Sequence, residues 1–278
     1  MPEQSATRLA LINAHERDSR ITFQEEGHVY TVDGMPNVYE SVTTVIHHFF
    51  EEFDADKVID KMMASKNWPN NVKYYGKTKD EIKAQWTSAG EYASSMGSKM
   101  HLDIEMFFDD EDHHVKYETM EAHSIEFKYF LNFYKKCVIP KIKIYRTEMY
   151  VFDEETKICG SIDALFQDLN DPTLFYIGDW KRSNEIKKHN PWKNGLFPVN
   201  HLEDTNYSKY SLQLNLYKYI LEKNYNMKIG GMFLIVLHPK NDNYLVEYVN
   251  DMGKEIKDII KYRVSTKMVN LSGNTNIV

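Results

Sequence analysis

The chain has 278 residues, 42% of them hydrophobic, and it carries 34 basic against 41 acidic residues, which gives a net charge of −7. This content predicts a globular protein with a sizeable core, in one domain or in one domain with a helical extension. It excludes a membrane-spanning helix, because no run of 18 apolar residues is present. The first residues include Glu3, Glu16 and Asp18 and contain no signal-peptide core, so we expect no membrane partner and an intracellular, reducing compartment.

The predicted elements begin with a β-hairpin and continue with helices. Residues 20–23 and 28–32 alternate between apolar and polar side chains, which predicts a hairpin that closes near Gly34. Thr78 to Glu81 is a capping-box pattern, which marks the start of a helix. Apolar residues at helical spacing predict helices over residues 54–65, 89–108 and 124–137, the last of which stops before Pro140.

The second half of the chain predicts a sheet. Alternation and β-branched residues predict strands over residues 143–152, 160–167, 174–181, 232–237 and 244–249, with an amphipathic helix over 207–225 between the third and fourth. This order indicates an α/β protein. Residues 36–138 form a helical subdomain in this interpretation, and the polar tail 272–278 is expected to fray.

Two of these strands each carry a carboxylate. Asp163 lies on one strand and Asp179 on the next, and Asn170 to Pro172 supply a turn that would make them neighbours. The two-residue repeat places Asp179 and Lys181 on one face, while Trp180 points into the opposite layer. Two carboxylates beside an ammonium suit a hard divalent cation and phosphodiester hydrolysis. An Asp-x-Lys triplet also occurs by chance in many proteins, so the pattern needs support from its context.

Four short motifs supply that context, in one order along the chain. They are Gly97-x-x-x-His101, Gly160-x-x-Asp163, Asp179-x-Lys181 and Gln213-x-x-x-Tyr217. Together they resemble the motifs of the RecB-like branch of the PD-(D/E)xK nuclease superfamily. The resemblance covers residues 20 to 250 and is most similar to stand-alone exonucleases of large DNA viruses and phages, which implies a viral protein in a host cell with a part in DNA repair or recombination.

The resemblance implies a fold and a set of site residues. The fold is a restriction-endonuclease-like core with a central mixed sheet flanked by helices, plus an N-terminal helical region, so that 1–278 is one nuclease domain with a catalytic core over 143–250. The implied ligands of Mg or Mn are His101, Asp163, Asp179 and the backbone carbonyl of Trp180. The implied helpers are Lys181, which positions water and stabilises the transition state, Gln213, which positions the water or the lysine, and Tyr217, which contacts nucleic acid.

Several details around this site come from the residues themselves. Gly97, His101 and Glu105 share a helix face, where the glycine would let another backbone approach and the glutamate could orient the ring. Glu148 either lies near the metal or is a strand-edge charge that faces solvent. Lys181 would work better if burial and nearby cations lower its pKa. The chain has only two cysteines, Cys137 and Cys159, so no four-cysteine iron–sulfur cluster can form within it.

The candidate DNA contacts come from local charge. Residues 127–147 contain no acid but include Lys135, Lys136 and Arg146 among aromatic residues, and a second basic cluster contains Lys181, Arg182, Lys187, Lys188 and Lys193. Either run could instead be a solvated face. The loop over 183–206 carries Trp192 and Phe197, which either stack on unpaired bases or pin the loop to the body.

The sequence therefore predicts a metal-dependent deoxyribonuclease, with an exonuclease that prefers single-stranded DNA ends as the leading hypothesis. A structure-specific endonuclease or resolvase could use the same core. A non-catalytic DNA-binding module is a further alternative, which the retained charges argue against, because buried charges without a task carry a desolvation cost.

Overall fold

A mixed six-stranded sheet forms the centre of the computed structural model, which describes residues 7–110 and 123–273. The strands are β4 (Glu40–Ser41), β5 (Ile142–Asp153), β6 (Ile158–Asp168), β7 (Leu174–Lys181), β8 (Lys228–Val236) and β9 (Leu245–Val249). β5, β6 and β7 are antiparallel neighbours, β7 pairs with β8 in parallel, and β9 closes the sheet antiparallel to β8. The short β4 pairs in parallel with the start of β6. The predicted α/β fold with a central mixed sheet is confirmed.

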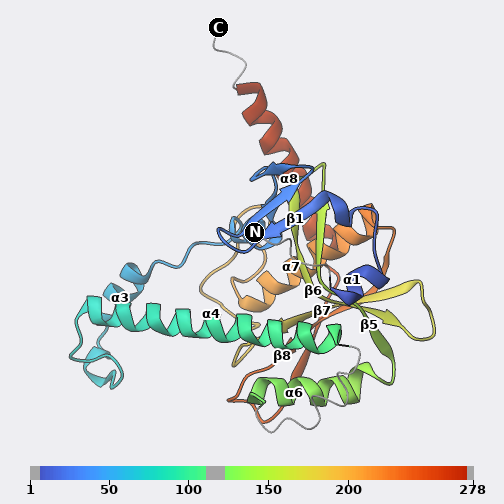
Figure 1. The fold of residues 1–278 in the computed structure, drawn as a ribbon. Helices are drawn as coiled ribbons and strands as arrows, with labels where there is room; N and C mark the ends of the chain where they lie inside the picture. Colours follow the sequence, from blue (N-terminus) through green and yellow to red (C-terminus); the bar gives the residue numbers. More distant parts are fainter. Residues whose placement is uncertain (1–6, 111–122, 274–278) are drawn as a thin grey trace.

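Helices cover both faces of this sheet (Figure 1). On one face lie α2 (Val42–His47), α7 (Asn206–Asn224) and α8 (Gly253–Gly273), which share a core with Ile177 and Leu234 of the strands. On the other lie α4 (Lys79–Asp109) and α6 (Ile125–Phe133), which pack on Phe166 and Trp180. A π-helical turn over Tyr134–Val138 continues α6. Trp180 thus points away from the face that holds α7, as the strand alternation predicted.

The N-terminal part adds smaller elements. α1 (Arg8–Ile12) and the 3-10 turn Asp18–Arg20 precede a small sheet of β1 (Ile21–Gln24), β2 (Val29–Val32) and β3 (Met35–Pro36). The predicted hairpin forms, but its turn lies at residues 25–28, where Gly27 has a φ of 81°. Gly34, with a φ of 73°, forms the next turn, between β2 and β3. The sequence prediction therefore placed the hairpin one turn too late.

Two helices differ from the sequence prediction. α4 begins at Lys79, directly after the Thr78 capping box, and continues without a break to Asp109, so the capping box and the predicted helix over 89–108 belong to one element. α3 (Ala55–Met63) and a 3-10 turn at Trp68–Asn70 lie beside its first turns, away from the sheet (Figure 1). α8 was not predicted at all. It extends to Gly273, and the rest of the tail that was expected to fray, 274–278, lies outside the described residues.

Two further expectations concern cysteines and membranes. Both cysteines are free thiols, and burial raises the pKa of Cys159 to about 12, which keeps it protonated and unreactive. Within residues 7–110 and 123–273, no helix is long and apolar enough to cross a membrane.

Candidate metal centre

The antiparallel pairing of β6 and β7 brings Asp163 and Asp179 together. Ala164 of β6 pairs with Gly178 of β7, so Asp163 and Asp179 lie opposite each other at the next position along the two strands. The backbone N–H of Trp180 donates a hydrogen bond to Asp163 Oδ2 over 2.9 Å. The connection at residues 169–173 contains the predicted turn. A local hairpin therefore places the two carboxylates side by side, because strand pairing over so short a connection needs little chain closure.

His101 reaches these acids from the other layer. It projects from α4, and its Nε2 lies 3.0 Å from the carbonyl oxygen of Trp180. Its Nδ1 lies 3.6 Å from Asp163 Oδ2 and 3.7 Å from Glu148 Oε1. Within residues 7–110 and 123–273, nothing outside the helix's own backbone lies within 4 Å of where a Cβ on Gly97 would be, so no close backbone approach to this glycine is found among them. The ring is oriented by Trp180, Asp163 and Glu148 rather than by Glu105.

Glu148 turns toward the site through an unusual backbone. Its φ is 43°, in the left-handed region, although it lies within β5. Its Oε2 accepts a 2.7 Å hydrogen bond from the hydroxyl of Ser161 on β6. Of the two interpretations of this glutamate, the structure supports the one in which it lies beside His101 and Asp163 rather than pointing into solvent.

The site contains more negative charge than its protein partners neutralise. Burial raises the pKa of Asp163 and of Asp179, although His101 opposes the shift at Asp163 and Lys181 opposes it at Asp179. Burial and the charge of Glu148 raise the pKa of Glu105 to about 7. Burial alone would lower the pKa of His101, but Asp163 and Glu148 outweigh it and raise that pKa to about 9. Carboxylates held this way are stabilised by an added cation.

A divalent metal ion fits this donor set. His101, Glu148 and Asp163 each offer one ligand atom, and the three atoms lie within 4.8 Å of one another. Asp179 is buried beside them, and its Oδ2 forms an ion pair with the Lys181 ammonium. Carboxylate oxygens with one imidazole suit Mg²⁺ or Mn²⁺, whereas a zinc site would favour more nitrogen or sulfur ligands.

Lys181 lies next to Asp179 on the face of β7 that looks toward α7. Its Nζ forms an ion pair with Asp179 Oδ2 at 2.5 Å and lies 4.5 Å from the centre of the Tyr210 ring. Burial tends to lower the pKa of Lys181, but Asp179 and Asp163 raise it overall. The lowered lysine pKa that the sequence analysis considered is therefore not found in this structure. The ammonium stays charged.

Gln213 and Tyr217 take different places on α7. Gln213 is half-buried and lines a small pocket with Tyr210 and His47. Tyr217 is buried, and its hydroxyl would lie 2.8 Å from a Cβ on Gly160. Tyr217 therefore packs beneath the site, and a direct contact with nucleic acid does not fit this placement. Gly160 of one motif, which has no side chain, leaves the space that the Tyr217 ring of another motif occupies.

The predicted DNA-contacting cations divide into buried and exposed groups. Arg182 is held by Glu126 in a buried 2.7 Å ion pair, and Arg146 is buried against Asp18 at 2.8 Å. Neither guanidinium is available to a phosphate, which corrects the sequence prediction. Lys135 and Lys136 are exposed, but Lys136 lies in a pocket with Asp168 and Tyr176, at the end of β6 and β7 remote from Asp163 and Asp179.

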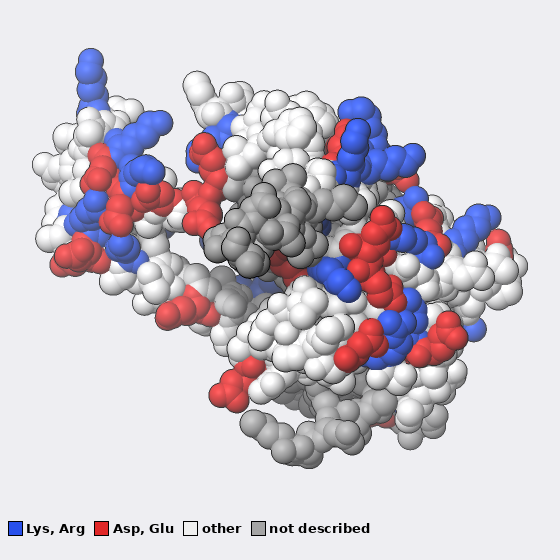
Figure 2. Space-filling model, turned by 90° about the horizontal axis from the view of Figure 1, so that it is seen from above, with Lys and Arg blue, Asp and Glu red and all other residues white. Residues whose placement is uncertain are grey.

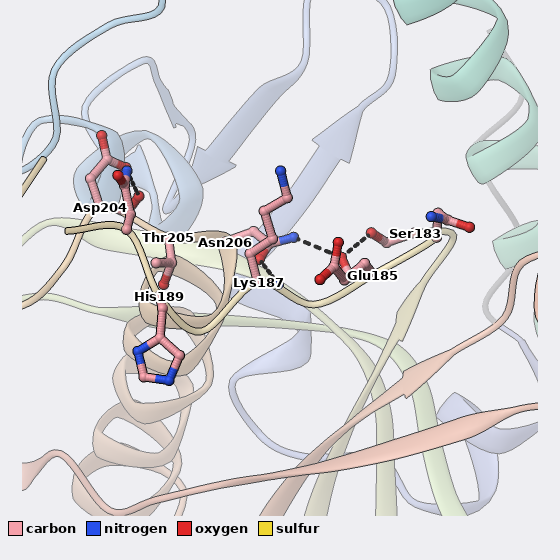
Figure 3. A pocket seen from close by; sticks show the side chains of 9 residues that line it. Ser183, Glu185, Lys187, His189, Asp204, Thr205 and Asn206 are labelled. Atoms are coloured by element: carbon pink, nitrogen blue, oxygen red, sulfur yellow. Dashed lines mark hydrogen bonds between the residues drawn. The ribbon is translucent and has the colours of Figure 1, made fainter. Parts of the chain in front are cut away.

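The loop over residues 183–206 follows Lys181 closely in the chain. It borders a pocket of about 690 Å³ that begins at Ser183 and includes Lys187, His189 and the start of α7 (Figure 3). In Figure 3 the Lys187 side chain extends away from the loop. Lys188 pairs with Glu247 over 2.6 Å at the surface. Trp192 and Phe197 are 89% and 68% exposed, and Phe197 contacts the ring of Tyr262.

Two residues at this site were not singled out from the sequence. Ser161 precedes Asp163 by two positions, so strand alternation places both on one face, and Tyr210 precedes Gln213 by three positions on α7. Both spacings were visible, but without the fold nothing distinguished these residues from ordinary polar neighbours.

Comparisons with known proteins add little to this geometry. No family model matches the chain, and no curated protein matches its sequence. Among solved structures, SSO0001 has a TM-score of 0.27 at 11% identity, over 83% of this chain and 76% of its own. A protein from Eubacterium rectale called a “putative exonuclease” has a TM-score of 0.31 at 13% identity, over 84% of this chain and 80% of its own.

Proposed function

We propose that this protein is a metal-dependent deoxyribonuclease, and that it acts as an exonuclease on single-stranded DNA ends. The observation that carries the proposal is the convergence of His101, Glu148 and Asp163 beside the buried pair Asp179 and Lys181. An imidazole, three carboxylates and one ammonium in a half-buried site suit the hydrolysis of a phosphodiester better than a structural ion site, which has no use for the lysine.

In this proposal the residues divide the work. Bound Mg²⁺ or Mn²⁺ would be held by His101, Asp163, Asp179 and the Trp180 carbonyl, with Glu148 as a further ligand, and would supply Lewis acidity toward the phosphate and its attacking water. Lys181 places its ammonium beside the scissile phosphate and stabilises the charge that develops on its oxygens. Asp179 and the Tyr210 ring fix the direction of that ammonium. Gln213 orients the attacking water from α7.

The preference for unpaired ends rests on the loop after β7. Trp192 and Phe197 present exposed rings in the loop whose first part lines the pocket after Lys181, and Lys187 adds a charge to that pocket. An aromatic ring stacks on a base only when the base is not paired, and each stacked base contributes roughly 1–3 kcal/mol in single-strand binders. The contact between Phe197 and Tyr262 leaves Trp192 as the freer of the two rings.

One assay separates the alternatives. End-labelled single-stranded, duplex and circular DNA are incubated with the protein and Mg²⁺ or Mn²⁺, alongside the Asp163→Asn variant as a control for contaminating nuclease. Cleavage of linear single strands, with circles intact, supports the proposal. Cleavage of circles identifies an endonuclease on the same core. No metal-dependent cleavage of any substrate, with Mn²⁺ still bound in calorimetry, would refute nuclease activity.

A further inference from the structure

α4 connects the candidate metal centre to an arm that stands away from the sheet. We define the arm as α3, the turn at Trp68–Asn70 and the first half of α4, residues 54–95 (Figure 1). The arm has a small core of its own, where Ile59 and Ile82 are fully buried and the Trp86 indole donates a 2.8 Å hydrogen bond to the Tyr74 hydroxyl. Because α4 is one continuous helix, His101 and the arm belong to one rigid rod.

The middle of α4, residues 87–95, is exposed to solvent. Every residue from 87 to 95 is exposed, and the contact that the described chain makes with this span of α4 is the Arg182 guanidinium, 6.0 Å from the centre of the Tyr92 ring. The span includes Thr87, Ser88, Gly90, Ser94 and Ser95, which are modest or poor helix formers, and its one charged residue is Glu91. A helix is usually kept in place by an apolar face packed on a neighbour, and this span contains no buried apolar residue. Small hydroxyl side chains leave room for a ligand to approach the helix closely.

The tip of the arm is basic within an acidic molecule. Residues 61–79 contain five lysines and no acid, while the whole chain has a net charge of −7. Lys79 is paired with Asp60, but Lys61, Lys66 and Lys73 are exposed and form no ion pair within the described chain. Exposed apolar surface lies among them, with Val72 at 98% and Tyr75 at 56% exposure. The lobe at the left of Figure 2 carries this mixture of lysines and acids, clear of the body.

We propose that the arm is a second nucleic-acid contact, along which the substrate lies after it leaves the metal centre. This inference rests on the proposed function. Lysines without acidic partners attract phosphates, serine and threonine hydroxyls donate to phosphate oxygens, and the exposed Tyr75 ring offers a stacking face. An acidic protein would satisfy the lysines alone and would leave the bare hydroxyl span without a role, so a sugar–phosphate backbone fits the whole surface better.

The geometry gives the contact a minimum substrate length. The part of α4 from Lys79 to His101 is roughly 33 Å long at about 1.5 Å per residue. A duplex advances about 3.4 Å per base pair, so roughly ten pairs are needed to reach from the metal centre to the arm tip. Shorter substrates contact only the metal centre, whereas longer substrates contact both the metal centre and the arm. The arm therefore adds affinity only above a length threshold.

The test compares two double variants that each remove two charges from the arm. Lys61→Gln with Lys66→Gln neutralises two tip lysines that form no ion pair within the described chain. Lys57→Gln with Lys83→Gln neutralises lysines that already pair with Asp54 and Asp56. Binding is measured by fluorescence anisotropy in an Asp179→Asn background, so that cleavage does not intervene, with labelled DNA hairpins whose stems have six and thirty base pairs, over a range of salt concentrations.

We expect the tip variant to weaken binding of the thirty-base-pair DNA about three- to tenfold and to lower the salt slope by about one per lysine removed, with binding of the six-base-pair DNA unchanged. The control variant should change the affinity for DNA of either length by no more than about twofold. Equal loss on both lengths, or no loss on the long DNA, would overturn the arm contact. Because this readout is binding, it remains decisive even if the wild-type protein cleaves no DNA and the proposed function fails.

The bare span has its own test. Ser88 and Ser95 lie two helical turns apart and therefore on one face of α4. Ser88→Glu with Ser95→Glu should repel long DNA, whereas Ser88→Gln with Ser95→Gln adds similar bulk without charge and should bind it at near wild-type strength. If the glutamate and glutamine variants bind long DNA equally, the strand does not pass along α4.

Discussion

Glu148 has a backbone conformation that residues of its type rarely adopt. A left-handed φ at a non-glycine residue costs roughly 1–3 kcal/mol, and here it falls inside strand β5, between the paired residues Thr147 and Met149. The hydrogen bond from Ser161 and the nearby His101 hold the carboxylate in place. Strain maintained beside a cluster of acids suggests that this side chain is kept for what it binds and not for what it adds to the fold.

This strain can be measured by comparing two substitutions at Glu148. Both Glu148→Gly and Glu148→Ala remove the carboxylate, but only glycine relieves the left-handed backbone. We expect the glycine variant to exceed the alanine variant by about 1 kcal/mol in free energy of unfolding without metal, measured by urea denaturation. Calorimetry should show both losing Mn²⁺ affinity at least tenfold. Equal stability of the two variants would show that the position is not strained.

Lys181 provides the sharpest test of the chemistry. Lys181→Ala should reduce cleavage at least a hundredfold, because a preorganised charge at the phosphate is worth about two to three orders of magnitude in rate. Lys228→Ala, on the exposed start of β8 and opposite Leu174 in the ladder, is the matched control and should keep full activity. Cleavage by Lys181→Ala near the wild-type rate, under saturating Mg²⁺, would remove the lysine from the mechanism.

At the scale of elements, Gly160 and Tyr217 join β6 to α7 directly under the metal centre. A Cβ at Gly160 would lie 2.8 Å from the Tyr217 hydroxyl and 2.9 Å from its ring, so the tyrosine would have to shift. Two motifs that look independent in the sequence are thus two halves of one packing contact. This contact sets the distance between Asp163 on the strand and Gln213 on the helix.

Alanine substitutions at two glycines should therefore have opposite signs. Gly160→Ala should destabilise the fold by about 1–3 kcal/mol through overpacking. Gly97→Ala, on α4 with nothing within 4 Å of the new methyl group, should stabilise it by about 0.5–1 kcal/mol because alanine is the better helix former. Denaturant unfolding of both variants measures the difference. A neutral Gly160→Ala would mean that Tyr217 moves without cost.

Asp153 ties the β5–β6 connection to the end of α7 and makes stability depend on pH. Its buried carboxylate accepts hydrogen bonds from Thr156 and Asn224 and pairs with Lys223 at 2.8 Å. Burial alone would raise its pKa, but these partners, Lys223 foremost, lower it overall. A lowered folded-state pKa means that the stabilisation is fully present above the unfolded-state pKa and is lost as the pH falls through the folded value.

The corresponding experiment is a series of denaturation curves at acidic and neutral pH. At neutral pH, Asp153→Ala should cost about 3 kcal/mol, because it leaves three donors on Thr156 and Asn224 without their acceptor and removes one of the two carboxylates that pair with Lys223. Asp153→Asn should lose stability less steeply than the wild-type protein as the pH falls below 4. If the two pH profiles run parallel, another carboxylate is responsible for the acid sensitivity.

The sheet could be predicted because its strands alternate clearly and their turns carry Asn, Asp, Pro and Gly. α8 was missed because its buried residues Ile256 and Ile259 lie among many charged and polar residues, so the apolar face of the helix is narrow and short. Asp163, Asp179, Lys181 and His101 converge in the structure as their motifs indicated. The left-handed Glu148 and its bond to Ser161 could not have been found, since they depend on strand register and not on residue type.

At the scale of the whole molecule, charge counting along the chain misjudged which cations are free. Arg146 and Arg182 belong to basic runs in the sequence, yet Asp18 and Glu126, more than fifty residues away in the chain, neutralise them in buried pairs. The sequence analysis did not identify the tip of the arm as a basic surface, because acidic residues of α3 and α4 flank it along the chain. Only the fold shows that those acids pair with Lys57, Lys79 and Lys83 and leave the tip lysines unpaired.

The continuity of α4 has a thermodynamic consequence. One helix carries both His101, at the sheet, and the arm, in solvent. DNA that binds the arm and tilts α4 therefore also changes the distance from His101 to Asp163. Occupancy of the metal centre and occupancy of the arm are then linked, and linkage is reciprocal: the factor by which Mn²⁺ tightens DNA binding must equal the factor by which DNA tightens Mn²⁺ binding. Interrupting the rod with Gly90→Pro, which would bend α4 between its two ends, should bring both factors toward one together.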